Sequence, residues 1–213
     1  GEDCSYVAGP DADPVPAPNL TGSYVRSDIL PSLADETAFT NWKAWSVFEP
    51  QAKGVGNRGY WDAVFDGRYV YFLPYGHSGD SHGEVLRYDT QSAFDDISGW
   101  VTYDPGEHGI SEDGLTYQGG IFDGQYIYFC PGADDGIWVG EILRLDTASE
   151  FTDSTSWTAY NPSGDGIGSR AAGYTGGAFD GRYVYFSPWR NDGGNSSEVI
   201  RFDTLSEFSS DSS

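Results

Sequence analysis

The octapeptide FDGRYVYF fills residues 65–72, returns as FDGQYIYF at 122–129 and occurs a third time as FDGRYVYF at 179–186. Its first residue moves from 65 to 122 to 179, a constant interval of 57 residues without an insertion or a deletion. A fixed period of this length is typical of repeat proteins, in which each repeat forms one structural unit and neighbouring units share a core. The chain therefore predicts three units of the same design.

Each octapeptide predicts a β-hairpin, because an Asp-Gly pair suits a two-residue turn whose central residues adopt positive φ. In the first unit we expect strands that end at Phe65 and run over about 68–73, 84–89 and 100–103. The segments YVYF and EVLRY are apolar on both faces, as strands are in a sheet that lies between two neighbours. Four short antiparallel strands per unit are thus expected. The turn residues are Asp66 and Gly67, Asp123 and Gly124, and Asp180 and Gly181.

The third unit stops before its fourth strand, and a match to that strand stands at the other end of the chain. The segment FTNWKAWSVFEP at 39–50 aligns with FDDISGWVTYDP at 94–105. This alignment places Trp45 with Trp100, and Trp157 holds the same place in the second unit. We expect the N-terminal strand to complete the third sheet, so that no sheet edge is left bare.

These units resemble those of secreted bacterial tandem-repeat proteins with propeller-like blades, loosely akin to kelch repeats. The resemblance is carried by the FDGRYVYF hairpin, the VLRYDT strand and the Trp-x-x-Tyr-Asp-Pro strand, over residues 39–213. It implies an all-β fold of three four-stranded blades, closed by N- and C-terminal strands in one sheet. Propellers typically have about 4–8 blades. Two alternatives therefore stay open: a β-trefoil-like threefold fold, and blades from several chains that complete one another.

Charge and composition narrow the range of partners. The chain has 11 Lys and Arg residues against 33 Asp and Glu residues, a formal net charge of −22. Such a charge repels nucleic acid and anionic membrane surfaces, so we expect neither as a partner. No apolar stretch approaches the roughly 18 residues that membrane insertion requires. The chain begins with Gly1 and contains no Met, which predicts a processed N-terminus and a secreted, extracellular protein.

Residues 1–38 predict a proline-rich arm in front of a three-repeat β domain at 39–213. The segment GPDADPVPAPN at 9–19 favours an extended conformation that reaches far from the domain. Cys4 and Cys130 are the two cysteines and are candidates for a disulfide, either within one chain or between two. In the second case the arm would hold a neighbour, and a head-to-tail contact that does not close gives a filament.

The recurring charged residues favour structural roles over catalysis, so no enzyme is expected. The Asp-Gly pairs fix turns, and an Asp-Thr pair at a strand end caps the following turn. The mid-strand residues Arg87, Arg144 and Arg201 are expected to pair with recurring acids between units. No metal site is predicted from His77, His82 and His108, because none recurs or shows ligand spacing. Calcium is the one cofactor left open, since GADDG at 132–136 and RNDGGN at 190–195 group oxygen ligands.

Two functions from different classes follow. The leading hypothesis is a non-enzymatic structural subunit that self-associates with copies of itself through its N-terminal arm. A filament is one form that this association could take. The alternative is a secreted carbohydrate-binding module, in which Tyr75, Trp138 and Trp189 of the loops after the second strands stack on sugars. Sequons at Asn19 and Asn195 are candidate glycosylation sites.

Overall fold

The computed structural model describes residues 40–75, 82–111, 116–134, 137–168 and 171–208. In these ranges the chain forms β-strands and short 3-10 helices and no α-helix, which confirms the predicted all-β class. The chain divides into two units, Gly1–Val47 and Phe48–Ser213, and the sheets belong to the second. The predicted boundary at residue 38 and the whole predicted arm lie outside the described residues.

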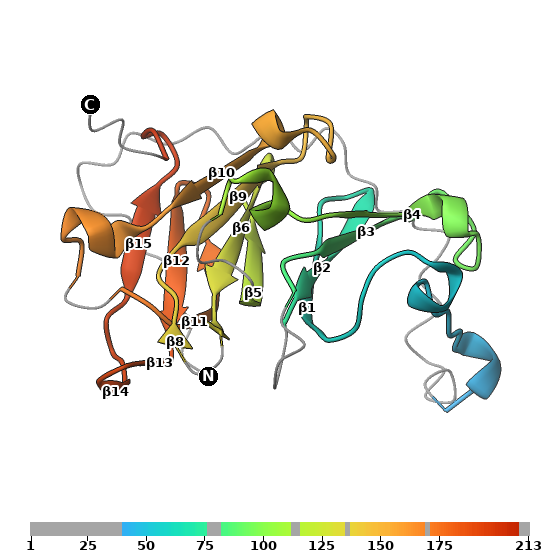
Figure 1. Ribbon diagram of the computed structural model, residues 1–213, viewed down its shortest axis with the longest axis horizontal. Coiled ribbons are helices and arrows are strands. Elements are labelled where there is room, and N and C mark those ends of the chain that lie inside the picture. The colour runs from blue at the N-terminus through green and yellow to red at the C-terminus, as the bar shows by residue number, and fades with distance from the viewer. Residues whose placement is uncertain (1–39, 76–81, 112–115, 135–136, 169–170, 209–213) are drawn as a thin grey trace, which may run out of the picture. The chain divides into compact units, whose positions relative to one another are not determined.

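Two antiparallel sheets have four strands each and the third has three, and Figure 1 shows each as a meander. The first sheet has the order β1-β2-β3-β4, with β1 (Tyr60–Phe65), β2 (Tyr69–Pro74), β3 (Val85–Asp89) and β4 (Trp100–Tyr103). The second sheet contains β5 (Tyr117–Phe122), β6 (Tyr126–Pro131), β9 (Ile142–Asp146) and β10 (Trp157–Tyr160). The third contains β11 (Tyr174–Phe179), β12 (Tyr183–Pro188) and β15 (Ile200–Asp203). The four-stranded sheets are compatible with propeller-like blades.

Short elements fill the loops between these strands. Two small hairpins follow β6 and β12, and they consist of β7 (Ala133–Asp134) with β8 (Ile137–Trp138) and of β13 (Arg190–Asn191) with β14 (Gly194–Asn195). The 3-10 helices are η1 (Trp42–Ala44), η2 (Gln51–Lys53), η3 (Ile97–Gly99), η4 (Gly106–His108), η5 (Ser154–Ser156) and η6 (Pro162–Asp165). None of the helices in the described ranges is long or apolar enough to cross a membrane.

The predicted hairpin turns form, but the central residues of the turn differ from those expected. Asp66 donates its backbone N–H to the Tyr69 carbonyl (3.1 Å), so Gly67 and Arg68 are the central residues of the turn. The positive φ falls on Gly67, at 106°. The Asp66 carboxylate instead accepts the backbone N–H groups of Arg68 (2.7 Å) and Tyr69 (2.7 Å). The aspartate therefore serves as the acceptor that closes the turn.

The sheets pack face to face in chain order. One core cluster joins the first sheet to the second, for example Tyr71 and Val85 with Phe129 and Phe151. A second cluster joins the second sheet to the third, through Ile121, Tyr128, Cys130 and Ile142 on one side and Tyr174, Val184, Phe186 and Phe208 on the other. The two-sided apolar strands noted in the sequence thus face two different neighbours, as a stack of sheets requires.

The first strand of each sheet is the one that approaches its neighbours most closely. β1 packs against β5, and β5 packs against β11. A Cβ atom on Gly119 would lie 2.6 Å from the Gly176 Cα atom and 2.6 Å from the Thr175 carbonyl oxygen. A Cβ atom on Gly120 would lie 2.3 Å from a Val64 methyl group. The paired glycines of β5 therefore permit a backbone approach that a side chain would prevent.

The expected closure of the third sheet by the N-terminal strand is not observed in the described part of the chain. The third sheet has three strands there, residues 45–49 form no strand, and no closed sheet results. Trp45 is 62 % exposed, whereas its counterparts Trp100 and Trp157 are 5 % and 4 % exposed. A strand needs a hydrogen-bonded partner, and the sequence match alone does not say where that partner comes from.

Candidate functional site

Each sheet has two apolar faces, and each face carries residues that recur at the same repeat positions in the other sheets. We call the face turned toward the next sheet along the chain the leading face, and the opposite one the trailing face. The leading face of the first sheet carries Tyr71, Leu73, Val85 and Arg87, and it packs on the trailing face of the second sheet. The leading face of the second sheet packs in the same way on the trailing face of the third. The chain thus builds one type of interface twice.

The recurring arginines lie inside these interfaces, against aromatic rings. The Arg87 guanidinium stands 4.3 Å from the centroid of the Tyr69 ring and 4.4 Å from that of Phe151, which belongs to the next sheet. Arg144 repeats this with Tyr126 (4.3 Å) and Phe208 (4.4 Å). The expectation of ion pairs between Arg87 or Arg144 and recurring acids is therefore corrected: the partners across the interface are rings, which attract a cation through their negative faces.

A buried tyrosine accompanies each of these two arginines, and its hydroxyl donates to the aspartate of the hairpin turn. The Tyr71 hydroxyl donates to Asp66 Oδ2 (2.8 Å), and its ring lies 5.9 Å from the Phe151 ring of the second sheet. Burial raises the pKa of Tyr71 above its ordinary value, and the hydrogen bond to the Asp66 carboxylate raises it further. The hydroxyl thus stays protonated and keeps the tyrosine in place at the interface.

The third sheet has a leading face with no sheet packed on it among the described residues. We call it the open leading face, and define it by Ala178, Tyr185, Ser187, Val199 and Arg201. Val199 is 62 % exposed, whereas its counterparts Val85 and Ile142 are 0 % and 2 % exposed. A hollow of about 550 Å³ lies on this face and is lined by Tyr185, Ser187 and Val199. Arg201 stacks on the Tyr183 ring of its own sheet (4.0 Å) as Arg87 stacks on Tyr69.

The first sheet has the matching surface, which we call the open trailing face and define by Phe48, Phe72, Leu86 and Phe94. A hollow of about 550 Å³ is lined by these four residues together with Tyr60 and Trp100. Phe94 is 40 % exposed, whereas its counterparts Phe151 and Phe208 are 1 % and 4 % exposed under a neighbouring sheet. Burial in the apolar wall of this hollow raises the pKa of Tyr60 to about 12.

Phe48 occupies on the first sheet the place that a fourth strand of a preceding sheet would occupy. Its ring lies 6.2 Å from Phe94 and 5.6 Å from Trp100. One repeat later, Tyr103 of β4 lies 6.1 Å from Phe151 and 5.5 Å from Trp157 of the second sheet. Phe48 therefore lies on the open trailing face in the place that Tyr103, from the fourth strand of the preceding sheet, takes on the second sheet.

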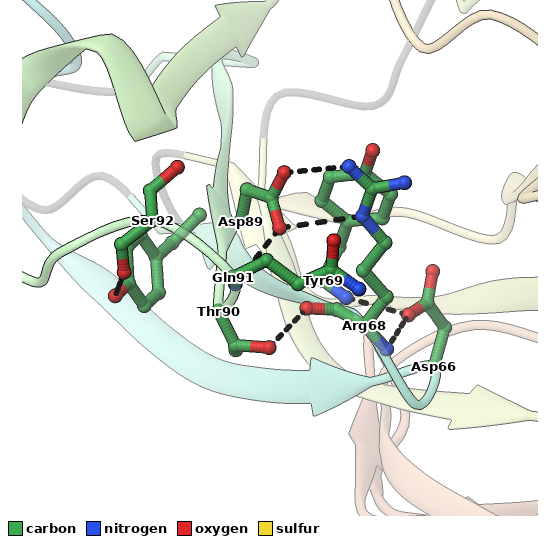
Figure 2. Close-up of polar contacts among 8 residues, drawn as sticks. Asp66, Arg68, Tyr69, Asp89, Thr90, Gln91 and Ser92 are labelled. Atoms are coloured by element: carbon green, nitrogen blue, oxygen red, sulfur yellow. Dashed lines mark hydrogen bonds and ion pairs between the residues drawn. The ribbon is translucent and has the colours of Figure 1, made fainter.

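At the hairpin ends of the sheets, recurring polar residues form a clamp between the turn and the third strand. Figure 2 shows the Arg68 guanidinium facing the Asp89 carboxylate, with Nη2 donating to Oδ2 (2.8 Å) and Nε to Oδ1 (3.3 Å). The Thr90 hydroxyl donates to the Arg68 carbonyl (2.6 Å). The Arg68 side chain lowers the pKa of Asp89. Arg182 and Asp203 repeat the ion pair, and Gln125 donates to Asp146 at 3.4 Å in the second sheet.

The aromatic residues of the sugar hypothesis are brought into pairs. Trp138 and Trp189 stand edge to face with ring centroids 5.3 Å apart, and Tyr75 lies 4.6 Å from Trp61. Trp61 and Trp189 remain exposed. The sequon residue Asn195 lies exposed in β14, and Asn19 lies outside the described residues. Glycosylation at either position stays a prediction.

Cys130 is fully buried between the second and third sheets, and burial raises the pKa of its thiol. Because Cys4 lies outside the described residues, the disulfide between them stays a prediction.

The histidines of the described ranges take structural roles. His82 donates from Nε2 to the Arg58 carbonyl (2.6 Å), and His108 donates from Nδ1 to the Asp104 carbonyl (2.9 Å) and stacks on Tyr103. His77 lies outside these ranges. Across the part of the chain that the structure describes, no three His, Cys, Asp or Glu side chains gather as metal ligands would. The proposed calcium loop at 132–136 is only partly described, so calcium stays a prediction.

The residues that define the two open faces, apart from Arg201, were not singled out in the sequence. Phe94, Tyr185 and Val199 align with residues that are buried in the neighbouring repeats, and nothing in their chemistry sets them apart. The available signal was their place in the first and third repeats, because among the described residues no sheet packs before the first or after the third.

No protein-family model matches the sequence of this chain, and no curated protein matches it either.

Proposed function

We propose that this protein is a non-enzymatic, extracellular structural subunit that associates head to tail with copies of itself. The open leading face of one copy would pack on the open trailing face of the next. The observation that carries the proposal is that both surfaces belong to an interface which the chain already forms twice internally. Such a contact is heterologous, so it gives a ring if the rotation between copies closes and a filament if it does not.

The internal interfaces specify which residues would meet. Arg87 and Tyr71 contact Phe151 within the chain. The corresponding contact between copies places Arg201 and Tyr185 of one copy on Phe94 of the next. Val199 would enter the hollow beside Leu86, as Val85 shares a buried cluster with Leu143. Both surfaces are apolar at their centres, and the Arg201 cation on one surface would face the Phe94 ring on the other, which favours their contact.

The structural roles of the recurring acids support a non-enzymatic function. The Asp66 carboxylate is engaged by two backbone N–H groups and the Tyr71 hydroxyl. The Asp89 carboxylate is engaged by the Arg68 side chain and the Gln91 backbone N–H. Carboxylates held in this way stabilise turns and strand ends. An extracellular location and a contribution of residues 1–38 to association rest on the sequence alone.

The test is sedimentation velocity of the intact chain beside two single variants. Val199→Lys places a charge at the centre of the open leading face, and Leu205→Lys is the matched control in an exposed turn of the same sheet. Loss of a buried valine costs about 1.5–3 kcal/mol, which is roughly ten- to a hundredfold in Kd. We expect oligomers for the wild type and for Leu205→Lys, and a shift toward monomer for Val199→Lys. A monomeric wild type across the accessible concentration range would overturn the proposal.

A chain that lacks residues 1–38 separates the two possible sources of association. Loss of oligomers in this deletion would assign association to the arm, and persistence would assign it to the sheet faces. The Val199→Lys result decides between these independently, because the substitution leaves the arm intact.

A carbohydrate-binding module is the second candidate, and the exposed Trp61 and Trp189 rings favour it. Each lies against another aromatic ring at the loop ends of the strands, an arrangement that offers an apolar patch to a sugar face. A glycan array with the wild type and with Trp189→Ala tests it. Binding that the substitution abolishes would support the candidate, and an array without signal would remove it.

A further inference from the structure

The third sheet and the segment before Phe48 are two halves of one motif. In the first and second sheets the fourth strand begins at a tryptophan and pairs with the third strand, with Trp100 opposite Tyr88 and Trp157 opposite Leu145. In the third sheet, the strand at the corresponding edge is β15, and no fourth strand follows it in the described residues. An edge strand of this kind offers its backbone N–H and C=O groups to an added strand.

Residues 41–45 already have the local structure that introduces a fourth strand. The Asn41 side chain accepts the Lys43 backbone N–H (3.2 Å) at the start of η1, as Asp96 accepts from Ser98 (3.0 Å) at η3 and Asp153 from Thr155 (2.9 Å) at η5. Each of these three 3-10 helices is followed by a tryptophan in extended conformation. The φ and ψ angles are −105° and 138° at Trp45, −116° and 129° at Trp100, and −117° and 145° at Trp157.

The third sheet presents the surroundings that such a tryptophan has elsewhere. In the second sheet, Trp157 stacks on Tyr103 (5.5 Å), contacts Phe151 (5.6 Å) and donates from Nε1 to the Phe151 carbonyl (2.8 Å). Around the third sheet, Tyr160 corresponds to Tyr103 and Phe208 corresponds to Phe151, and the Tyr160 and Phe208 rings are 5.9 Å apart. A hollow lined by Tyr160, Ile200, Phe202 and Phe208 lies beside β15.

We infer that residues 45–48 of one copy add to β15 of the preceding copy, whose open leading face packs on the donor's open trailing face, as the fourth strand of its third sheet. Trp45 is opposite Phe202 in this register, stacks on Tyr160 and donates from its indole N–H to the Phe208 carbonyl. The inference rests on the proposed head-to-tail association and deepens it by naming the donated strand. Phe48 of the donor stays on the donor's own Phe94 and Trp100, where it already lies. The docked sheet and the added strand therefore meet at the same place.

The strand added to β15 comes from a second copy rather than from the same chain, because of how the sheets are arranged. Closure within one chain would bring the third sheet onto the first and form a ring of three, whereas sheets of this kind close in rings of about 4–8. In the structure β5 packs on both β1 and β11, which places the second sheet between the other two. Two copies that exchange strands 45–48 would supply six sheets, a number within that range.

The first experiment compares Trp45→Ala with Trp42→Ala by sedimentation velocity. Both tryptophans are exposed and three residues apart, and neither lies in a buried cluster, so neither change endangers the fold. We expect Trp45→Ala to weaken association at least tenfold and Trp42→Ala to leave it unchanged. If Trp45→Ala associates like the wild type while Val199→Lys does not, the strand inference is overturned and the proposed function stands. If the wild type is monomeric, both are overturned.

The second experiment distinguishes donation between chains from donation within one. In a Cys4→Ser background, chains carrying Val47→Cys are mixed with chains carrying Ile200→Cys, residues that the inferred register places opposite each other. We expect a disulfide-linked heterodimer under mild oxidation, and none from the control mixture of Val47→Cys with Leu205→Cys. A chain carrying both Val47→Cys and Ile200→Cys is oxidised at high dilution. A monomer that has lost both engineered thiols would overturn donation between copies.

Discussion

At the scale of single residues, the aspartate of each hairpin turn joins the turn to the interface between sheets. Asp123 accepts the backbone N–H groups of Gln125 (2.9 Å) and Tyr126 (2.6 Å) and the Tyr128 hydroxyl (2.9 Å). Tyr128 also lies 5.7 Å from Phe208 of the third sheet. One carboxylate therefore fixes both the turn and a residue at the interface between sheets.

Replacing Asp123 by Ala should lower stability more than an ordinary surface substitution does. It removes the acceptor of two N–H groups and leaves the Tyr128 hydroxyl, on a buried residue, without its partner, which costs roughly 1–3 kcal/mol. Urea unfolding followed by fluorescence measures the change. The control is Asp192→Ala in an exposed turn. Equal midpoints for the two variants would contradict the assigned role.

The acid sensitivity of the protein should follow from its clamped carboxylates. The pKa of Asp89 is lowered by Arg68 and that of Asp203 by Arg182, and the pKa of Asp96 is lowered by the Ser98 backbone N–H. A carboxyl group whose pKa is lower in the folded state than in the unfolded state stabilises the fold at pH values above its unfolded-state pKa. This stabilisation is lost as the pH falls through the folded-state pKa. The urea midpoint should thus be level from pH 8 to about 5 and fall below about pH 4.

The double variant Asp89→Asn, Asp203→Asn provides the check on this pH dependence. It should be less stable than the wild type at pH 7 and should lose less on acidification. A wild-type midpoint that rises toward pH 3 would show that relief of the net negative charge outweighs these groups.

The arginines show where prediction from residues alone reaches its limit. Recurrence at mid-strand favoured a structural role for Arg87, Arg144 and Arg201. Their partners could not be read from the sequence, because Phe151 and Phe208 lie on the next sheet and become neighbours only when sheets stack. The acids that seemed the natural partners instead serve Arg68 and Arg182 at the turns.

At the scale of elements, the strands of each repeat were largely predictable. β4 spans Trp100–Tyr103 as expected, and β1 ends at Phe65. Turn chemistry and a period repeated without gaps fixed these boundaries. The failure of residues 45–48 to form a strand was not predictable, since their sequence matches β4. Strand formation depends on a hydrogen-bonding partner as much as on the segment itself.

The inner strand β5 supplies a prediction of its own. Gly119→Ala would place a methyl group 2.6 Å from backbone atoms of β11, which cannot rotate away as a side chain would. The second and third sheets would have to separate, at a cost of about 1–3 kcal/mol. Thermal unfolding should show a clear loss for this variant. Gly164→Ala is the matched control, because a Cβ atom there meets nothing within 4 Å.

If Gly119→Ala is as stable as Gly164→Ala, the close approach of β5 to β11 is not a feature of the protein in solution.

At the scale of the whole molecule, association has to overcome charge. Each copy carries a formal net charge of −22, so two copies repel each other at long range. The proposed contact itself is short-ranged, since it consists of apolar side chains and one arginine on a ring. Salt screens the long-range repulsion over about 10 Å at 0.1 M and leaves the apolar contact intact.

Raising NaCl from about 20 mM to about 300 mM should therefore strengthen self-association. Sedimentation equilibrium at both concentrations measures the change in Kd, and Leu205→Lys should follow the wild type. Association that weakens with salt would indicate an interface built on ion pairs and would contradict the proposed faces.

The identity of the first and third hairpins has a consequence for how the chain reaches its native state. Since FDGRYVYF occurs unchanged in both, β2 would accept β15 as readily as it accepts β3 on local recognition alone. Chain connectivity has to decide instead: pairing β2 with β3 closes a loop of about 10 residues, and pairing it with β15 closes one of about 125, which costs about 2 kcal/mol more. Refolding at low concentration should sort the sheets correctly, whereas a concentrated denatured chain is prone to kinetic traps in which hairpins of different molecules are exchanged.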